Sequence, residues 1–269
     1  MTPQAIGPAR AFFVASLASM LILATATVIA EPVGVRFAEG LVHGFLALSS
    51  LDGTTIADGD LIQSARGTRV TSRLVFHFKD GSLHDETSVF TQRDQFKILS
   101  YHLVQKGPSF PRPLEMSIDP NGVATVRFTD EHGRAKTERE QIVPPGDLAN
   151  GMVPILLKNV RRGAVPRQFS MIVATPKPRL VTLKLQAPTQ ESFSTGGARR
   201  KATHYVLKID IGGLTGLIAP LAGKEPPDQH VWILEDGAPA FLKSEQQLYV
   251  DGPLWRIELV SPVWPRSFN

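Results

Sequence analysis

Two histidines and a glutamate beside one predicted β-turn carry side chains that can bind a divalent metal ion. His77 and His84 flank the Asp-Gly pair at 80–81, which is preferred in two-residue hairpin turns. In such a hairpin His77 faces His84, and Glu86 lies close enough for the three side chains to converge. The same residue types are common on the solvated face of a sheet. We therefore interpret them as solvated, with an Arg73–Glu86 ion pair, and keep a metal site at His77, His84 and Glu86 as the weaker alternative.

Other catalytic signatures are missing from the sequence. The chain has no cysteine, which excludes a thiolate nucleophile, a Cys-ligated zinc site and any disulfide. It also lacks a Gly-x-Ser-x-Gly nucleophile elbow, a His-Glu-x-x-His zinc motif and a phosphate-binding glycine loop. The net charge of +4 gives no argument for a nucleic-acid partner. The sequence predicts no cofactor and no catalytic residue, and it favours a protein that is not an enzyme.

Basic residues gather around the end of a predicted helix, at Lys158, Arg161, Arg162 and Arg167. Cations suit the negative end of the helix dipole, which accounts for them without a ligand. The alternative is a site for an anionic lipid headgroup.

A second group of candidates is apolar. The segment Gly212–Pro227 is rich in glycine and proline and yet carries several large apolar side chains. We interpret it as an ordered loop over an open end of the sheet, with a flap lining a hydrophobic pocket as the alternative. The residues that this pocket would use are Leu214, Leu217, Ile218, Met152, Ile155 and Trp232.

The elements that must position these side chains are mostly β-strands. In Arg69–Lys79 apolar and polar residues alternate, as is typical of a half-buried antiparallel strand. Similar runs, separated by Asp-Gly and Pro-Asn-Gly turns, predict strands at Leu41–Leu48, Ser82–Gln92, Phe96–Val104, Leu114–Ile118, Val123–Phe128, Arg134–Ile142, Phe169–Ala174, Leu180–Leu185, His204–Ile209, Val231–Leu234, Ala240–Glu245 and Trp255–Val260. The basic stretch Pro188–Ala202 is predicted to be a loop.

One segment has helical spacing instead. Asp147 can cap a turn, and Pro154 suits the first position of a helix that ends near Val160. An amphipathic helix in a β-rich chain buries its apolar stripe against the concave face of a curved sheet. The fold class that follows is all-β and mainly antiparallel, an open or half β-barrel of consecutive hairpins wrapped around one amphipathic helix.

The N-terminal segment has the composition of an export signal. Arg10 precedes an uncharged, largely apolar stretch at residues 11–30 that ends in small residues. We expect a signal peptide at 1–30 and a single β-rich domain at 31–269, which makes the protein exported, periplasmic or extracellular. The alternative is an anchor in the inner membrane formed by residues 11–30.

The C-terminal strands carry a resemblance to a known group of proteins. The runs His230–Asp236, Pro239–Glu245 and Leu254–Leu259 resemble the ending of uncharacterised secreted bacterial β-proteins, over about Val231–Leu259. The resemblance implies an open β-barrel wrapped on a helix, similar in shape to periplasmic lipoprotein carriers. The family has no established activity, so the resemblance implies no site residue.

Together these features predict an exported protein that binds or carries an apolar or amphiphilic ligand in the cell envelope. The expected partner is a hydrophobic small molecule or lipid, with a membrane surface as a further partner. The alternatives are an envelope scaffold that pairs through a sheet edge, and a hydrolase or isomerase that uses Asp, Glu and His on the open sheet face. The sequence does not determine the oligomeric state.

Overall fold

The computed structural model describes residues 32–161, 167–195, 198–211, 225–235 and 237–260. Within these ranges the chain forms fifteen strands and one helix. In chain order the elements are β1 Val42–Ser50, β2 Thr55–Arg66, β3 Arg69–Phe78, β4 Leu83–Gln92, β5 Phe96–Lys106, β6 Leu114–Ile118, β7 Val123–Thr129, β8 Ala135–Gln141, α1 Val153–Asn159, β9 Arg167–Ala174, β10 Pro178–Leu185, β11 Thr189–Thr195, β12 Ala198–Asp210, β13 Gln229–Leu234, β14 Ala240–Gln246 and β15 Trp255–Leu259.

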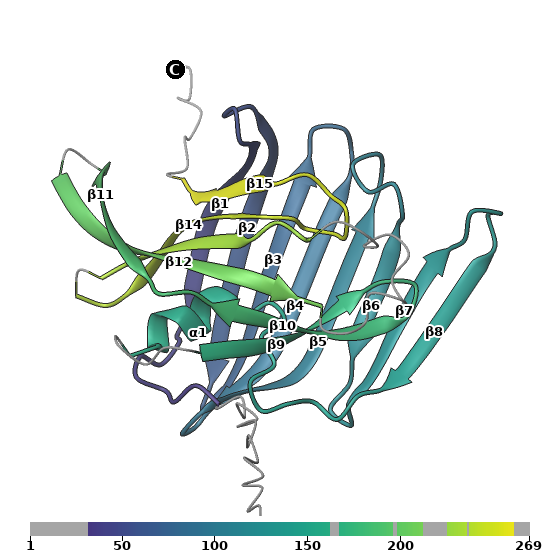
Figure 1. Ribbon diagram of the computed structural model, residues 1–269, viewed down its shortest axis with the longest axis horizontal. Helices are drawn as coiled ribbons and strands as arrows, with labels where there is room; N and C mark the ends of the chain where they lie inside the picture. The colour runs from purple at the N-terminus through teal and green to yellow at the C-terminus, as the bar shows by residue number, and fades with distance from the viewer. Residues whose placement is uncertain (1–31, 162–166, 196–197, 212–224, 236, 261–269) are drawn as a thin grey trace, which may run out of the picture.

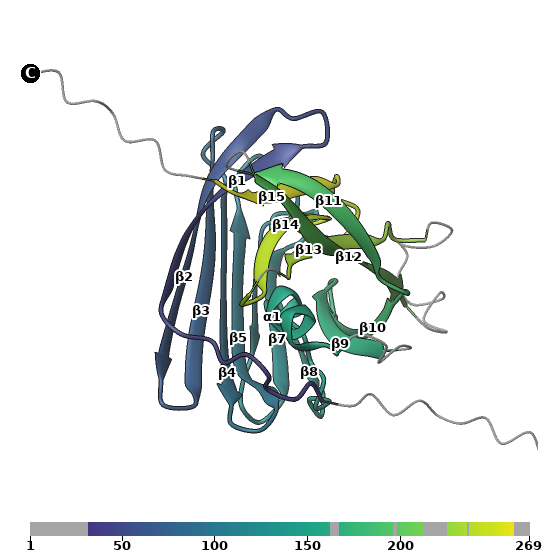
Figure 2. The ribbon, with the colours of Figure 1, turned by 90° about the vertical axis from the view of Figure 1, so that its left-hand side faces the viewer.

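All fifteen strands belong to one antiparallel sheet. Its order is β8-β7-β6-β5-β4-β3-β2-β1-β15-β14-β13-β12-β10-β9, with β11 paired to β12 outside this path. β1 pairs with β15, with Leu46 opposite Leu259, so the first and last strands lie side by side. The sheet folds over itself into two layers, β1–β8 and β9–β15, with α1 between them (Figure 1 and Figure 2). The predicted open, all-β fold around one helix is confirmed.

The two ends of the sheet are protected against pairing with another strand. β8 carries Lys136, Glu138, Arg139 and Glu140, and charged side chains discourage edge-to-edge association. β9 is covered by the segment before the helix, where Ala149 N donates to Ser170 O and the Asn150 side chain bonds both backbone groups of Ile172. The sheet is therefore open as a barrel without presenting bare edges at β8 and β9.

The helix starts where proline predicts it, but its cap differs. Pro154 lies in the first turn of α1, which suits a residue without a backbone N–H. The N-cap is Met152, which makes no side-chain capping bond, and the predicted cap Asp147 is instead buried, with its Oδ2 accepting from Ser170 Oγ at 3.2 Å. The apolar face of α1 is buried between the two layers, as expected for an amphipathic helix.

The β3–β4 hairpin has a different register from the predicted one. Phe78 N donates to Ser82 O and Gly81 N to Phe78 O, so the loop has three residues and ends in Gly81 at a φ of 84°. This is a turn followed by a left-handed glycine, the second most common hairpin loop. His84 therefore pairs with Phe76, and His77 pairs with Leu83. A shift of one residue turns every β4 side chain to the other face of the sheet.

Two strands lie where the sequence pattern predicts none. β2 contains Asp58, Gly59 and Asp60, which interrupt its alternation, and Gly59 lies under the ring of Phe76. The predicted loop Pro188–Ala202 is wrong, because its residues form β11 and the start of β12. The mostly polar sequence of β11 shows no alternation that would predict a strand, and β11 has a single neighbour in the sheet, β12.

The core has two parts. The larger one joins α1 to both layers through side chains such as Phe90, Met152 and Leu183. The smaller one is aromatic and contains Phe78, Phe110 and Trp255. In the described ranges there is no helix of the length and hydrophobicity needed to cross a membrane. The predicted signal peptide at 1–30 lies outside these ranges.

Candidate functional site

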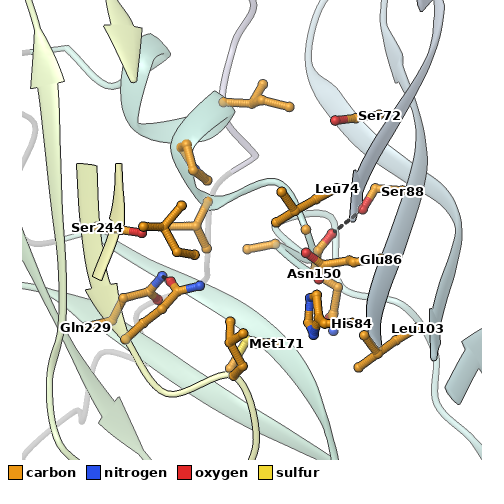
Figure 3. Close-up of a pocket in the computed structure, with 18 of the residues that line it drawn as sticks. Ser72, Leu74, His84, Glu86, Ser88, Leu103, Asn150, Met171, Gln229 and Ser244 are labelled. Atoms are coloured by element: carbon orange, nitrogen blue, oxygen red, sulfur yellow. Dashed lines mark hydrogen bonds between the residues drawn. The ribbon is translucent and has the colours of Figure 1, made fainter. Parts of the chain in front are cut away.

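A cavity of about 500 Å³ lies between the two layers of the sheet. One wall is the inner face of β1–β6, and the other is formed by α1, β9, β10 and the strands β12–β15. Figure 3 shows Leu74 and Leu103 on the first wall, Gln229 and Ser244 on the opposite side, and Met171 near one end. Most of the lining side chains are apolar, so the space suits an apolar molecule.

A row of polar side chains runs along one strand of this apolar wall. His84, Glu86 and Ser88 alternate along β4 and therefore share the face that lines the cavity. Ser72 on β3 lies opposite Ser88 and extends the row. Ser88 Oγ donates to Asn150 O at 3.0 Å, which ties β4 to the segment before α1.

Glu86 and Tyr101 form a partly buried hydrogen-bonded pair. Tyr101 Oη donates to Glu86 Oε1 at 2.7 Å, from the adjacent strand β5. Burial raises the pKa of the Glu86 carboxyl, although the hydrogen bond from Tyr101 works in the other direction. Burial, with the neighbouring carboxyl group, also holds the pKa of the Tyr101 hydroxyl well above its ordinary value. The pair places an acidic group in a mostly apolar cavity.

His84 is held in one tautomer by its neighbour Gln105. Gln105 Nε2 donates to Leu248 O at 2.7 Å and lies 3.0 Å from His84 Nδ1. Because an amide nitrogen donates and does not accept, Nδ1 is the acceptor and the ring proton is on Nε2. Nε2 is buried without a hydrogen-bond partner. Burial lowers the pKa of His84 to about 4, so the ring is neutral at pH 7.

Lys158 lies at the cavity wall and is already paired. Its Nζ is 2.5 Å from Glu39 Oε1, and both side chains are largely buried. Gln63 Nε2 donates to Glu39 Oε2 at 2.8 Å, and Gln92 forms hydrogen bonds with the Glu39 backbone N and O. The carboxylate thus has a full set of partners, and the ammonium charge of Lys158 is neutralised within the protein.

The predicted headgroup cluster is not gathered into one site among the described residues. Lys158 binds Glu39, Arg161 is exposed, and Arg162 lies outside the described ranges. Arg167 is half-buried at the start of β9, where its Nη1 is buried without a hydrogen-bond partner. The basic residues are close in sequence, but the described ones do not share a site in the structure.

The apolar candidates divide into three groups. Ile155 lines the cavity. Met152 is fully buried in the core and does not line it. Leu214, Leu217 and Ile218 lie outside the described residues, between Ile211 and Pro226, which both line the cavity.

Trp232 lies on the other face of β13, away from the cavity. Its ring stacks on His204 with centroids 4.2 Å apart, and Lys243 Nζ lies 4.2 Å from the centroid of the ring. Trp232 Nε1 donates to Glu191 Oε2 at 2.8 Å, and His204 lies 2.9 Å from both Glu191 and His230. Burial lowers the pKa of His204. Because successive side chains of a strand point to opposite faces, the sequence already places Trp232 on the other face from Val231 and Ile233. Only the register of β11–β14 brings Glu191, His204, His230 and Lys243 around it.

The three side chains of the alternative metal site do not converge at the β3–β4 hairpin. His77 is on the outer face of β3, whereas His84 and Glu86 line the cavity. Arg73 pairs with Asp85 at 2.7 Å and not with Glu86. In the part of the chain that the structure describes, no cluster of three or more His, Asp or Glu side chains could hold a metal ion.

Comparison with known proteins gives one fold-level likeness. No protein-family model and no curated protein matches the sequence. A similar solved structure is described as a β-barrel-like protein of domain of unknown function DUF1849 from Brucella abortus, with a TM-score of 0.48 and 8% identity. The match covers 85% of this chain and 100% of that one. The assignment of the fold class rests on this chain's own strand order.

Proposed function

We propose that the protein binds an apolar or amphiphilic molecule in the cavity between its two layers, as an exported component of the cell envelope. The observation that carries the proposal is the cavity itself, about 500 Å³ with predominantly apolar walls. Binding sites for small ligands typically measure about 300–1,000 Å³ and combine apolar walls with a few polar groups. The row on β4 and the pair Glu39–Lys158 supply such polar groups.

The rim of the cavity also favours an apolar ligand. Val42 on β1 and Leu259 on β15 line the cavity and are 39% and 44% exposed. Large apolar side chains that are both exposed and continuous with a cavity wall give an apolar molecule a low-energy path from the surface inward. A pairing scaffold has less support at β8 and β9, because charges on β8 and the segment over β9 protect these two edges of the sheet.

The expected affinity follows from the length of the buried chain. Each methylene group moved from water to an apolar site contributes about 0.8 kcal/mol, so a chain of ten gains about 8 kcal/mol. That equals the binding free energy of a complex with a Kd of about 1 μM, before the loss of ligand freedom is subtracted. Binding assays should therefore cover micromolar and weaker affinities.

Two adjacent residues of β2 provide a direct test. Leu61 lines the cavity, whereas Ile62 is 47% exposed and points to the outer face. We expect Leu61→Trp to fill part of the cavity and weaken binding of the fluorescent probe N-phenyl-1-naphthylamine by about tenfold or more. Ile62→Trp adds the same ring outside the cavity and should bind the probe like the parent. Equal binding by the parent and Leu61→Trp would refute the cavity as the binding site.

A further inference from the structure

Glu86 offers one free carboxyl oxygen inside the cavity. Its Oε1 is occupied by the hydroxyl of Tyr101 at 2.7 Å, and its Oε2 has no partner among the described residues. Glu86 lines the cavity, and Figure 3 shows its side chain projecting from β4 into the space beside Asn150. The oxygen is therefore available to a ligand.

Apolar side chains flank this carboxyl group on both sides. Leu74 on β3 and Leu103 on β5 lie directly opposite Glu86 in the two adjacent strands, and both line the cavity. Met171 on β9 lines the same space. An apolar chain lying along these three side chains would bring a polar end group to Glu86.

No cation compensates the Glu86 carboxyl in the part of the chain described. Among the described lining residues Lys158 is the one with a cationic side chain, and Glu39 already pairs with it. His84, two residues away on the same face, is neutral because burial lowers its pKa to about 4. Tyr101 also remains a neutral donor, since burial raises its pKa.

These groups determine which polar end can enter. An acceptor removed from water is stabilised by a donor, and a carboxylate is stabilised most by a cationic one. A second carboxylate brought beside Glu86 would meet repulsion and would also lose its own hydration. The polar end that fits beside Glu86 therefore donates hydrogen bonds and carries no negative charge.

We infer that Glu86 binds the polar end of the ligand through an N–H or O–H donor, so that the cavity accepts amine- or alcohol-ended apolar chains and excludes carboxylate-ended ones. The inference rests on the proposed ligand-binding function and adds the chemistry of the end group to it. Leu74, Leu103 and Met171 contact the chain in this arrangement.

Three ligands of one chain length test the inference. Dodecylamine, dodecanol and dodecanoate are titrated at pH 8 against the purified protein loaded with N-phenyl-1-naphthylamine, and displacement of the probe is measured. We expect the amine to bind most tightly, the alcohol next, and dodecanoate at least about tenfold more weakly than the amine. Dodecanoate binding as tightly as dodecylamine would overturn the inference, and this comparison needs no variant.

Variants identify the residue responsible. Glu86→Gln retains an oxygen that accepts from Tyr101 and should lower the affinity for the amine by about tenfold while relieving the exclusion of dodecanoate. Tyr101→Phe retains the carboxyl group and should keep the parental order. Glu115→Gln is the control, because that side chain is 40% exposed and pairs with His102 and Arg127 away from the cavity. An unchanged ligand order in Glu86→Gln would contradict the inference.

The outcomes separate this inference from the proposed function. If all three chains displace the probe with equal affinity, the cavity binds apolar ligands and the role of Glu86 is refuted. If the probe itself does not bind, the ligand-binding function fails, and the inference fails with it.

Discussion

Lys158 Nζ lies 2.5 Å from Glu39 Oε1 inside the protein, with exposed side-chain fractions of 16% and 6%. The pair joins α1 to the segment that precedes β1, at the wall of the cavity. Gln63 and Gln92 complete the hydrogen bonds of Glu39, so the geometry of the pair is fixed by three separate parts of the chain.

Removal of one partner of this pair should destabilise the fold. Lys158→Met leaves the Glu39 carboxylate buried without its counter-ion, which typically costs about 3–5 kcal/mol. Glu39→Gln combined with Lys158→Met removes both charges and should be more stable than Lys158→Met alone. Urea unfolding of the three proteins measures the difference. If Lys158→Met had the same free energy of unfolding as the parent, the ion pair would contribute nothing to stability.

His84 should make stability fall in mild acid. Its pKa is about 4 in the folded protein, below the ordinary value of 6.5, so between these values the unfolded chain binds more protons than the native one. Its contribution is complete above pH 6.5 and is lost as the pH falls towards 4, at about 1.4 kcal/mol per pH unit. Glu86, whose pKa is raised, contributes in the opposite direction, so the effect of His84 must be isolated by difference.

Two substitutions on the β3–β4 hairpin isolate the contribution of His84 to the pH dependence of stability. His84→Gln keeps an acceptor for Gln105 and should remove this part of the pH dependence in urea unfolding between pH 4.5 and 7.5. His77→Gln on the exposed outer face should leave the pH dependence unchanged. The same slope in the parent and in His84→Gln would contradict a neutral, buried His84.

The two described tryptophans should differ in what they stabilise. Trp255 packs in an aromatic cluster with Phe78, Phe110 and Tyr249, and Trp255→Ala should cost about 3–5 kcal/mol. Trp232 is covered by polar side chains that water can replace, so Trp232→Ala should cost less. Because Trp232 faces away from the cavity, Trp232→Ala should not change probe binding. Thermal melts and probe titrations measure both; weaker probe binding by Trp232→Ala would contradict this placement.

Gly59 should not tolerate a side chain. A Cβ at this position would lie 2.4 Å from the ring of Phe76, which is fully buried and cannot move away freely. Gly59→Ala should therefore cost about 1–3 kcal/mol. Gly40→Ala is the matched control, because open space surrounds that position. Adding Phe76→Leu to Gly59→Ala should relieve the clash, and a Gly59→Ala variant as stable as Gly40→Ala would show that the contact is not tight.

The sequence by itself determined most of the strands, the helix and the fold class. Alternation of apolar and polar residues is a property of neighbouring positions, so runs such as Arg69–Lys79 identify a strand without any tertiary information. Pro154 likewise marks the start of α1, because proline suits the first turn of a helix and disrupts its interior. Strands β2 and β11 were not predicted, because Asp58, Gly59 and Asp60 interrupt the alternation of β2 and because β11 is mostly polar.

The tertiary structure alone decided which side chains meet. The Asp-Gly pair at 80–81 fits a two-residue and a three-residue loop equally well, yet this one-residue difference decides whether His84 and Glu86 face solvent or the cavity. The pairs Glu39–Lys158 and Gln105–Leu248 join segments far apart in the chain, and no local pattern encodes them. The cavity exists because the sheet folds over α1 and brings two distant walls together, so its polar groups could be found only once that closure was known.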